Sequence, residues 1–372
     1  MSMTAYMYTP EFVKRGSLPV IGGTCKLRRN GVHTFSLTVD GGSALWQRFN
    51  KDWRVTIHDE GERLLSGVPL KIVETASKGV VTSELTGESD MTWLKDMITL
   101  PDPSKLADNQ GGEAYWNRKG AAGVLIRDLV NANVGPSARS EYRRPLVVGS
   151  VANGPAGTIN SRFKPVLDEV ATLAETAGLT VDIVQDDDLK QSVLTVVEGR
   201  DFSRRIRLSH ANAGIESHTF TLEAPTVTSV LVAGQGEGSA RTLKLTHGNE
   251  NTWGFRSLQF QDRRDTDDQK ELDAAGVDTL TGGQERATVS LEVNDTPLLK
   301  FGRDYHLGDT VTVQLSTGVT ITDTVQMAEL SWDENGRTVK LQVGPTADDE
   351  EQPRDVKEIN KLWKAVRGLQ TR

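Results

Sequence analysis

The stretch "GRDYHLGDTVTVQLSTGVTITDTVQ", residues 302–326, alternates apolar and polar residues on both sides of a turn signal. Val311, Val313 and Leu315 alternate with polar residues, and the pattern resumes after Gly318 with Val319 and Ile321. Period-2 alternation of β-branched residues is typical of strands, and glycine is common where a chain reverses. This stretch therefore predicts a β-hairpin.

A second stretch of the same length has a similar pattern. Residues 52–87, "DWRVTIHDEGERLLSGVPLKIVETASKGVVTSELTG", align without a gap with residues 309–344, "DTVTVQLSTGVTITDTVQMAELSWDENGRTVKLQVG". Three glycine pairs coincide in this alignment, at 61 and 318, 79 and 336, and 87 and 344, although the apolar phase slips by one residue in the outer strands. Because the glycines fall at expected turns or strand ends, we interpret the stretches as two related β modules.

The whole chain is predicted to be mainly β with α+β insertions. At 372 residues it is long enough for several compact units. We expect two small β-barrels, an inserted α+β domain and a short helical domain. The expected division is residues 1–110 for the first barrel, completed by returning strands at about 215–250, then 111–214 for the α+β insertion, 251–285 for the helical domain, 286–346 for the second barrel, and 347–372 for an acidic linker and a C-terminal helix.

Two helices are expected inside the insertion. The segment 112–135 carries apolar residues at helical spacing and ends at "NVG", and residues 161–179, "SRFKPVLDEVATLAETAGL", form an apolar stripe that ends before Gly178. Glycine after the last helical residue is a common cap.

Composition excludes several classes of protein. Charged residues make up 25% of the chain with a net charge of −8, which argues against a general nucleic-acid binder. The single cysteine, Cys25, excludes an intrachain disulfide. No apolar run approaches the roughly 20 residues of a membrane span, and the N-terminus lacks the apolar core of a signal peptide. We expect a protein that does not itself enter a membrane.

No motif in the sequence supports catalysis. The six histidines are scattered, with no HExxH or CxxC pattern and no local Ser or Cys nucleophile motif. The glycines at 234, 236 and 238 lack the Lys-Ser/Thr pair of a phosphate loop. The aspartates at 265, 267 and 268 lack calcium-loop spacing, since Lys270 stands where the turn glycine belongs. We expect neither an enzyme nor a bound cofactor or metal.

The order of these segments resembles a known family. The "DRRD" segment at 262–265, "FKPVLDEVATLAETAGL" and "LGDTVTV" carry the similarity to the baseplate-hub or tail-tip hub proteins of long-tailed bacteriophages, closest to the minor tail proteins of siphoviruses that infect actinobacteria. The resemblance implies a virion protein at the tail tip, assembled in the host bacterial cytoplasm. It implies a homotrimer whose six barrels match a hexameric tail tube and line the channel for DNA ejection.

Partners follow from the same resemblance: the tail tube or distal tail protein, tail-tip or fibre proteins, and DNA only in passage. Two alternatives remain at this point. One is a receptor-binding or carbohydrate-binding tail-tip protein, and the other is the hub of a contractile injection machine. A peptidoglycan hydrolase is less favoured because the sequence offers no carboxylate or metal cleft.

The C-terminal segment is the one candidate interaction site in the sequence. "RDVKEINKLWKAVRGL", residues 354–369, predicts an amphipathic helix whose basic face is opposed by an apolar stripe of five residues. Isolated helices of this length are marginal in water, so the stripe needs a surface to cover it. The chain itself, a neighbouring subunit or the next tail protein could supply it, and we favour an intermolecular contact anchored by Trp363. The stripe comprises Val356, Ile359, Leu362, Trp363 and Val366.

Overall fold

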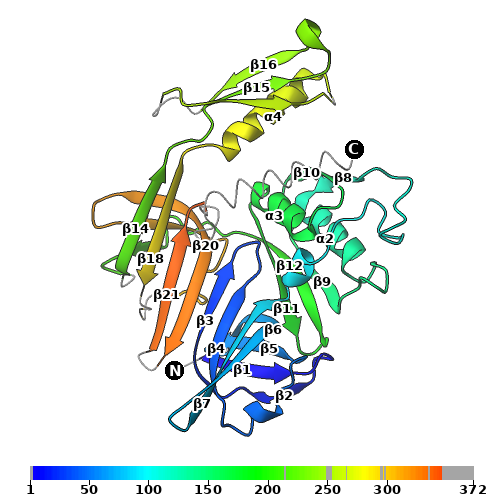
Figure 1. The fold of residues 1–372 in the computed structure, drawn as a ribbon. Coiled ribbons are helices and arrows are strands. Elements are labelled where there is room, and N and C mark those ends of the chain that lie inside the picture. Colours follow the sequence, from blue (N-terminus) through cyan, green and yellow to red (C-terminus); the bar gives the residue numbers. More distant parts are fainter. Residues whose placement is uncertain are drawn as a thin grey trace. The chain divides into compact units, whose positions relative to one another are not determined.

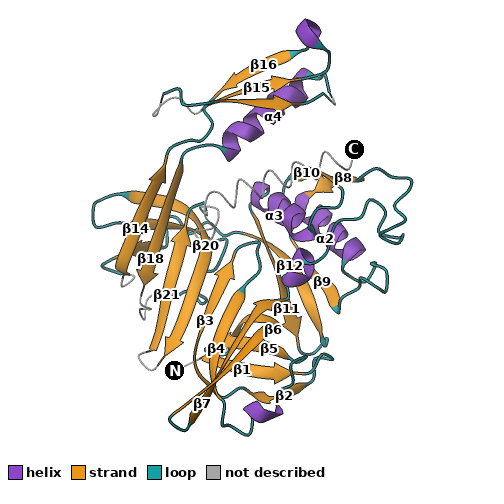
Figure 2. Ribbon diagram, in the orientation of Figure 1, coloured by secondary structure: helices purple, strands orange, loops and turns teal. Residues whose placement is uncertain are grey.

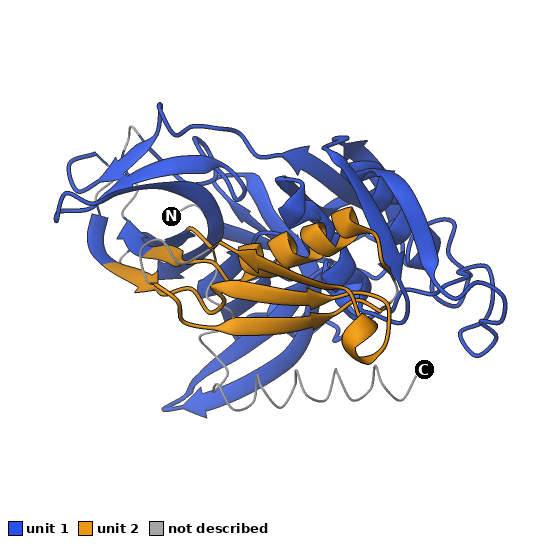
Figure 3. Cartoon of the chain, turned by 90° about the horizontal axis from the view of Figure 1, so that it is seen from above, with its two compact units in different colours: residues 1–218, 290–343 blue, residues 219–289, 344–372 orange. Residues whose placement is uncertain are grey.

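The computed structural model describes residues 3–212, 215–248, 254–264, 266–293, 296, 299–333 and 336–345. Strands dominate these residues and helices are few (Figure 2). The chain divides into two compact units, which Figure 3 colours separately: unit 1 comprises residues 1–218 and 290–343, and unit 2 comprises residues 219–289 and 344–372. The protein is therefore mainly β, as expected.

Thirteen strands of the described chain form one large sheet (Figure 1). Their order is β14-β18-β21-β20-β3-β4-β7-β6-β5-β1-β2, with β19 paired to β20 and β13 paired to β19. The strands are β1 (Met3–Tyr8), β2 (Lys14–Ser17), β3 (Val20–Arg28), β4 (Thr34–Asp40), β5 (Arg54–Asp59), β6 (Glu62–Ser77), β7 (Val80–Ser89), β13 (Arg207–Ser209), β14 (Ile215–Glu223), β18 (Arg286–Val293), β19 (Thr310–Gln314), β20 (Thr320–Asp333) and β21 (Gly336–Val343).

Alternation along these strands decides which face is buried. In β4, Phe35, Leu37 and Val39 are buried while the threonines and serine between them are half-exposed. In β21, Val339, Leu341 and Val343 are buried in the same way. Because side chains alternate between faces, each strand contributes one apolar row to the core.

The strands do not close into the two small barrels expected from the sequence. The reason is β20, which pairs with β19 through residues 320–324 and with β3 through residues 327–332. One long strand thus connects the C-terminal hairpins to the N-terminal ones. In the described part of the chain, these thirteen strands form one open sheet in place of two separate barrels.

The insertion expected at 111–214 contains both predicted helices. α2 (Ala122–Asn133) ends before Val134, and α3 (Val166–Thr176) is followed by Gly178 with φ +68°. Both helices contribute buried residues to one core together with the adjacent strands. The other elements here are α1 (Thr92–Lys95), the pair β8 (Trp116–Ala121) and β10 (Ala156–Ser161), and the sheet of β9 (Leu146–Val151), β11 (Leu179–Asp186) and β12 (Gln191–Glu198).

The described residues of unit 2 form a three-stranded sheet and one α-helix. The sheet has the order β16-β15-β17, and its core is formed by Val227, Val230, Val232, Leu272, Ala275 and Leu280. The carboxylate of Asp268 caps the helix by accepting a 2.8 Å hydrogen bond from the backbone N–H of Lys270. The elements are β15 (Ser229–Ala233), β16 (Leu243–His247), β17 (Leu258–Asp262) and α4 (Gln269–Gly282).

The segments expected to complete the first barrel, at about 215–250, form β14, β15 and β16. β14 lies beside β18, while β15 and β16 belong to the sheet of unit 2. The helix expected in 251–285 is α4, with β17 before it. The finer division into modules and inserted domains stays a prediction.

Candidate assembly interface

The same three-stranded meander occurs twice, as β5-β6-β7 and as β19-β20-β21. Val55 pairs with Gly67 in the first copy, and Val311 pairs with Asp323 in the second. These two residues of the second copy lie 256 positions after their counterparts, as the pair Thr312–Thr322 does after the pair Thr56–Ser66. The repeat therefore extends from the sequence pattern to the backbone pairing.

A bulge lies at the same place in both copies. In the first, Pro69 pairs with Gly87 and Lys71 with Thr86, so Leu70 is left over. In the second, Val325 pairs with Val343 and Met327 with Gln342, which leaves over Gln326. A bulge inserts one residue and bends its strand, and matching bulges are a specific structural correspondence.

The sequence alignment that matches the glycines uses a spacing of 257 residues. It differs by one residue from the spacing of 256 that the strand pairing shows. The turn between β5 and β6 has two residues, Glu60 and Gly61, whereas Gly318 ends a three-residue loop between the paired Leu315 and Val319. Turn glycines therefore do not occupy equivalent positions. The slip of the apolar phase was the signal in the sequence that pointed to this correction.

The second meander joins the N-terminal strands through the outer edge of β20. Cys25 of β3 pairs with Leu330, and Leu27 pairs with Ala328, in an antiparallel ladder. All four of these side chains are buried. The bent half of β20 that follows the bulge therefore has a partner strand on both sides, β21 and β3.

The equivalent edge of β6 carries no partner strand among the described residues. β5 pairs with β6 only up to Gly67, and β7 covers the other side of residues 67–77. Residues 70–77 are all exposed. Ile72 is 42% exposed although its cross-strand neighbour on β7, Leu85, is fully buried. The apolar face of the sheet thus continues to an uncovered edge.

β14 lies at one end of the large sheet and pairs only with β18 among the described strands. This strand is mostly exposed, with Phe220 at 38% and Leu222 at 47%. The hydroxyl of Ser217 donates a 3.2 Å hydrogen bond to the carboxylate of Glu292 on β18. Phe220 and Leu222 therefore lie on the opposite face of β14 from Ser217. Free edges with exposed apolar side chains are sites of strand pairing between chains.

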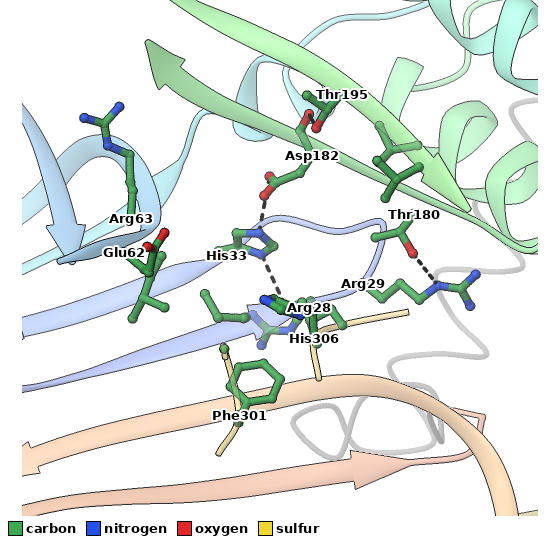
Figure 4. Close-up of a pocket in the computed structure, with 16 residues that line it drawn as sticks. Arg28, Arg29, His33, Glu62, Arg63, Thr180, Asp182, Thr195, Phe301 and His306 are labelled. Carbon is green, nitrogen blue, oxygen red and sulfur yellow. Dashed lines mark hydrogen bonds and ion pairs between the residues drawn. The ribbon is translucent and has the colours of Figure 1, made fainter. Parts of the chain in front are cut away.

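A cavity of about 300 Å³ with both apolar and polar lining lies in unit 1, between β3, β6, β11 and the loop at 301–307 (Figure 4). His33 is its central side chain: its Nδ1 accepts a hydrogen bond from the backbone N–H of Arg28, and its Nε2 is 3.4 Å from Asp182. Arg29 donates a 3.2 Å hydrogen bond to the Thr180 hydroxyl. Burial lowers the pKa of Arg29, and the carboxylates of Glu175 and Asp323 oppose that effect.

These polar groups connect β11 with the end of β3 and the residues that follow it. Among the described residues, no group of three or more His, Cys, Asp and Glu side chains could hold a metal ion. The described helices include none long and apolar enough to span a bilayer.

A buried ion pair makes a second connection between the sheet and the insertion. Arg54 and Asp90 are 2.5 Å apart, and the hydroxyls of Ser66 and Ser192 each donate a 2.7 Å hydrogen bond to Asp90. Arg54 also contacts Gln185 through a 3.2 Å hydrogen bond. Because all partners are satisfied, this network fixes β5 and β6 against β11 and β12.

The five residues of the predicted C-terminal stripe, Val356, Ile359, Leu362, Trp363 and Val366, lie outside the described residues. The edges of β6 and β14 were missed by the sequence reasoning. The alternation of apolar and polar residues indicates which face of a strand is buried. It does not indicate whether the edge of that strand has a partner.

Comparisons with known proteins agree with this fold. Solved structures that match include a tail protein from Neisseria meningitidis MC58, with 13% identity, a TM-score of 0.61 and coverage of 93% of this chain and 97% of that one. The 43 kDa tail protein of prophage MuSo2 from Shewanella oneidensis has 12% identity and a TM-score of 0.61, with coverage of 92% and 97%. Prophage tail protein gp18 from Listeria monocytogenes EGD-e has 10% identity and a TM-score of 0.52, with coverage of 98% and 99%.

The search of curated proteins found no match. A family model, described as Siphovirus ReqiPepy6 Gp37-like protein, matches residues 5–345 and so spans most of the chain. The protein belongs to this family of siphovirus tail proteins and is a component of the phage virion.

Proposed function

We propose that this tail protein is the trimeric hub at the distal end of the tail tube, where it matches a hexameric tube to the tail tip and lines the channel for DNA ejection. The observation that carries the proposal is the repeated meander with one edge filled and one edge free. β3 fills the edge of β20 within the chain, and no described strand pairs with the equivalent edge of β6. A second copy of the chain supplies the missing strand.

β14 is the strand that suits this edge. It is nine residues long, as is β3, and it lies beside β18 as β3 lies beside β4. In this proposal, β14 of one subunit pairs with residues 71–77 of β6 in the next subunit. The junction between subunits then repeats the junction within the chain.

The proposed register follows from the internal junction. Arg28 ends β3 and pairs with Met327. Aligning the two nine-residue strands end to end puts Glu223 in the place of Arg28, and the spacing of 256 puts Lys71 in the place of Met327. Glu223 therefore faces Lys71, and Leu222 faces Ile72. Opposite charges and apolar pairs across strands each stabilise by about 0.2–1 kcal/mol.

Such pairing joins different surfaces of each subunit, so it either closes into a ring or continues without end. Each subunit contributes one junction within its own chain and one junction to the next subunit. A closed ring of three subunits therefore has six junctions. The hexameric tube implied by the family resemblance supplies the reason for three copies. The tail tube or distal tail protein and the tail-tip or fibre proteins are the proposed neighbours.

The net charge of −8 supports a channel through which DNA passes. Binding to DNA is driven by cationic groups that displace counterions from phosphates. An acidic wall avoids that attraction, and therefore does not retain the passing DNA. No cofactor is proposed.

The test is the mass of the purified protein by native mass spectrometry, with negative-stain images of the particles. We expect trimeric rings. Lys71→Glu and Glu223→Lys should each weaken the trimer, because each puts like charges opposite one another, and the double exchange should restore it. Lys119→Glu, on an exposed part of β8, is the matched control. A stable monomer for the wild-type protein would contradict the trimer. Trimers unaffected by either exchange would contradict this interface alone.

A further inference from the structure

The cavity around His33 has the size and the mixed lining of a site for a small molecule. Its volume of about 300 Å³ lies within the range of ligand pockets in proteins. The sixteen residues that line it all belong to unit 1 (Figure 4). They come from the large sheet, from β11 and β12, and from the loop at 301–307. The lining therefore brings together side chains that are far apart in the sequence.

One part of the lining is apolar and preformed. Phe301 is 3% and Leu27 is 5% exposed, so packing holds both side chains in place. The ring of Tyr305 lies edge-on to that of Phe301, with 5.6 Å between the ring centres. An apolar or aromatic group in the cavity would meet a surface that already exists, which reduces the cost of ordering side chains on binding. The apolar lining residues are Leu27, Leu64, Val181, Val197, Phe301 and Leu307.

The charged part of the lining is more cationic than anionic. Both histidines in it are neutral, because a protonated imidazole has no acceptor. Nδ1 of His33 accepts a hydrogen bond from the backbone N–H of Arg28. Nδ1 of His306 accepts a 2.7 Å hydrogen bond from the guanidinium of Arg200. Three positive charges therefore line the cavity with two negative ones, which favours an anion over a cation. The charged lining residues are Arg28, Arg29, Arg63, Glu62 and Asp182.

Two of these arginines are suited to pair with an anion. Among the described residues, the guanidinium of Arg28 donates one long hydrogen bond, of 3.4 Å, to the carbonyl of Val32. A guanidinium has five N–H donors and binds a carboxylate through two parallel hydrogen bonds, so Arg28 has donors to offer. Burial lowers the pKa of Arg29, although Glu175 and Asp323 oppose that effect. An anion in the cavity would offset this cost of burying a positive charge.

We propose that this cavity binds a small organic anion, whose anionic group pairs with Arg28 and whose apolar or aromatic body lies against Phe301 and Leu27. The ligand would contact the large sheet and the loop at 301–307 together, and its binding would stabilise the folded chain by mass action. The site is independent of the proposed hub role and of the trimer, because unit 1 of one chain supplies every lining residue.

Calorimetric titration of the full-length protein tests the site. The probes are 2-naphthoate and octanoate, which carry the same carboxylate on an aromatic and on an aliphatic body. We expect one probe molecule bound per chain. The uncharged analogue 2-naphthol should bind about tenfold more weakly than 2-naphthoate, because a hydrogen bond to a charged group is stronger than one between neutral groups. Arg28→Gln should weaken binding of the carboxylates about tenfold for the same reason. Arg144→Gln, at an exposed position outside the cavity, is the matched control.

A further variant distinguishes the cavity from other apolar surfaces of the protein. Val197→Trp places a larger side chain in the lining, and Val197 is 47% exposed, so the change does not overpack the core. It should abolish binding of both probes, while thermal unfolding shows that the variant is folded. Absence of binding by both probes to the wild-type protein would overturn the proposal. Equal affinity for 2-naphthol would exclude recognition of an anion, and binding that survives both Arg28→Gln and Val197→Trp would assign the probes to another surface.

Discussion

Leu70 and Gln326, which are 256 positions apart, are the single bulged residues of two matching strand pairs. Each bends a long central strand, and in each case the half after the bulge is covered on one side by the third strand of its meander. The two strands differ at the edge opposite that third strand. β3 pairs there with β20, and no described strand pairs with β6 at that edge. That asymmetry within a repeat is the structural basis of the proposed ring.

The turn between β19 and β20 depends on the backbone conformation of Gly318. Its φ is +86°, and a Cβ at this position would contact nothing within 4 Å. Gly318→Val should therefore destabilise the protein through backbone strain alone, by about 1–3 kcal/mol. Thermal unfolding measures the loss. Gly111→Val is the control, since Gly111 is equally unobstructed and does not have a positive φ. Equal melting temperatures for the two variants would contradict the turn assignment.

The buried pair of Arg54 and Asp90 should be sensitive to removal of one partner. Asp90→Ala leaves the guanidinium of Arg54 buried without its carboxylate, which should cost about 3–5 kcal/mol. Urea unfolding gives the free energy of unfolding of the variant. Replacement of both residues, as Arg54→Met with Asp90→Leu, should cost less, because no uncompensated charge remains. A double variant less stable than Asp90→Ala would show that the pair itself is needed.

Alkaline stability should depend on Tyr8. Burial, helped by the hydrogen bond that its hydroxyl donates to Asp187, raises the pKa of Tyr8 to about 12. A group whose pKa is raised on folding stabilises the protein fully below its unfolded pKa, near 10, and loses that contribution as the pH rises toward 12. The free energy of unfolding should fall by about 2 kcal/mol across this window. Tyr8→Phe should remove that part of the fall. Identical pH profiles for both proteins would refute it.

The purified protein should not degrade bacterial cell walls. The sequence has no nucleophile or metal motif, and the family and the matching structures are tail proteins. Incubation with purified peptidoglycan should release no soluble fragments, with a known muramidase as the positive control. Release of fragments that one point substitution abolishes would show that a catalytic site exists.

The sequence alone determined the hairpin at 302–326 and the helices before Gly135 and Gly178, but it did not indicate strands such as β1, β8 and β9. Alternation in residues such as Val311 and Val313, or helical spacing before Gly178, is a local signal, because side-chain direction follows from local backbone geometry. The repeat was visible for the same reason.

The tertiary structure decided the register and the partners. Turns of different length moved the glycines at 61 and 318 out of equivalence, so the repeat aligns at 256 and not at 257. The pairing of β20 with β3 joined the two meanders into one sheet. Edge-to-edge pairing uses backbone hydrogen bonds that every residue except proline can make, and therefore no residue pattern records which edge has a partner.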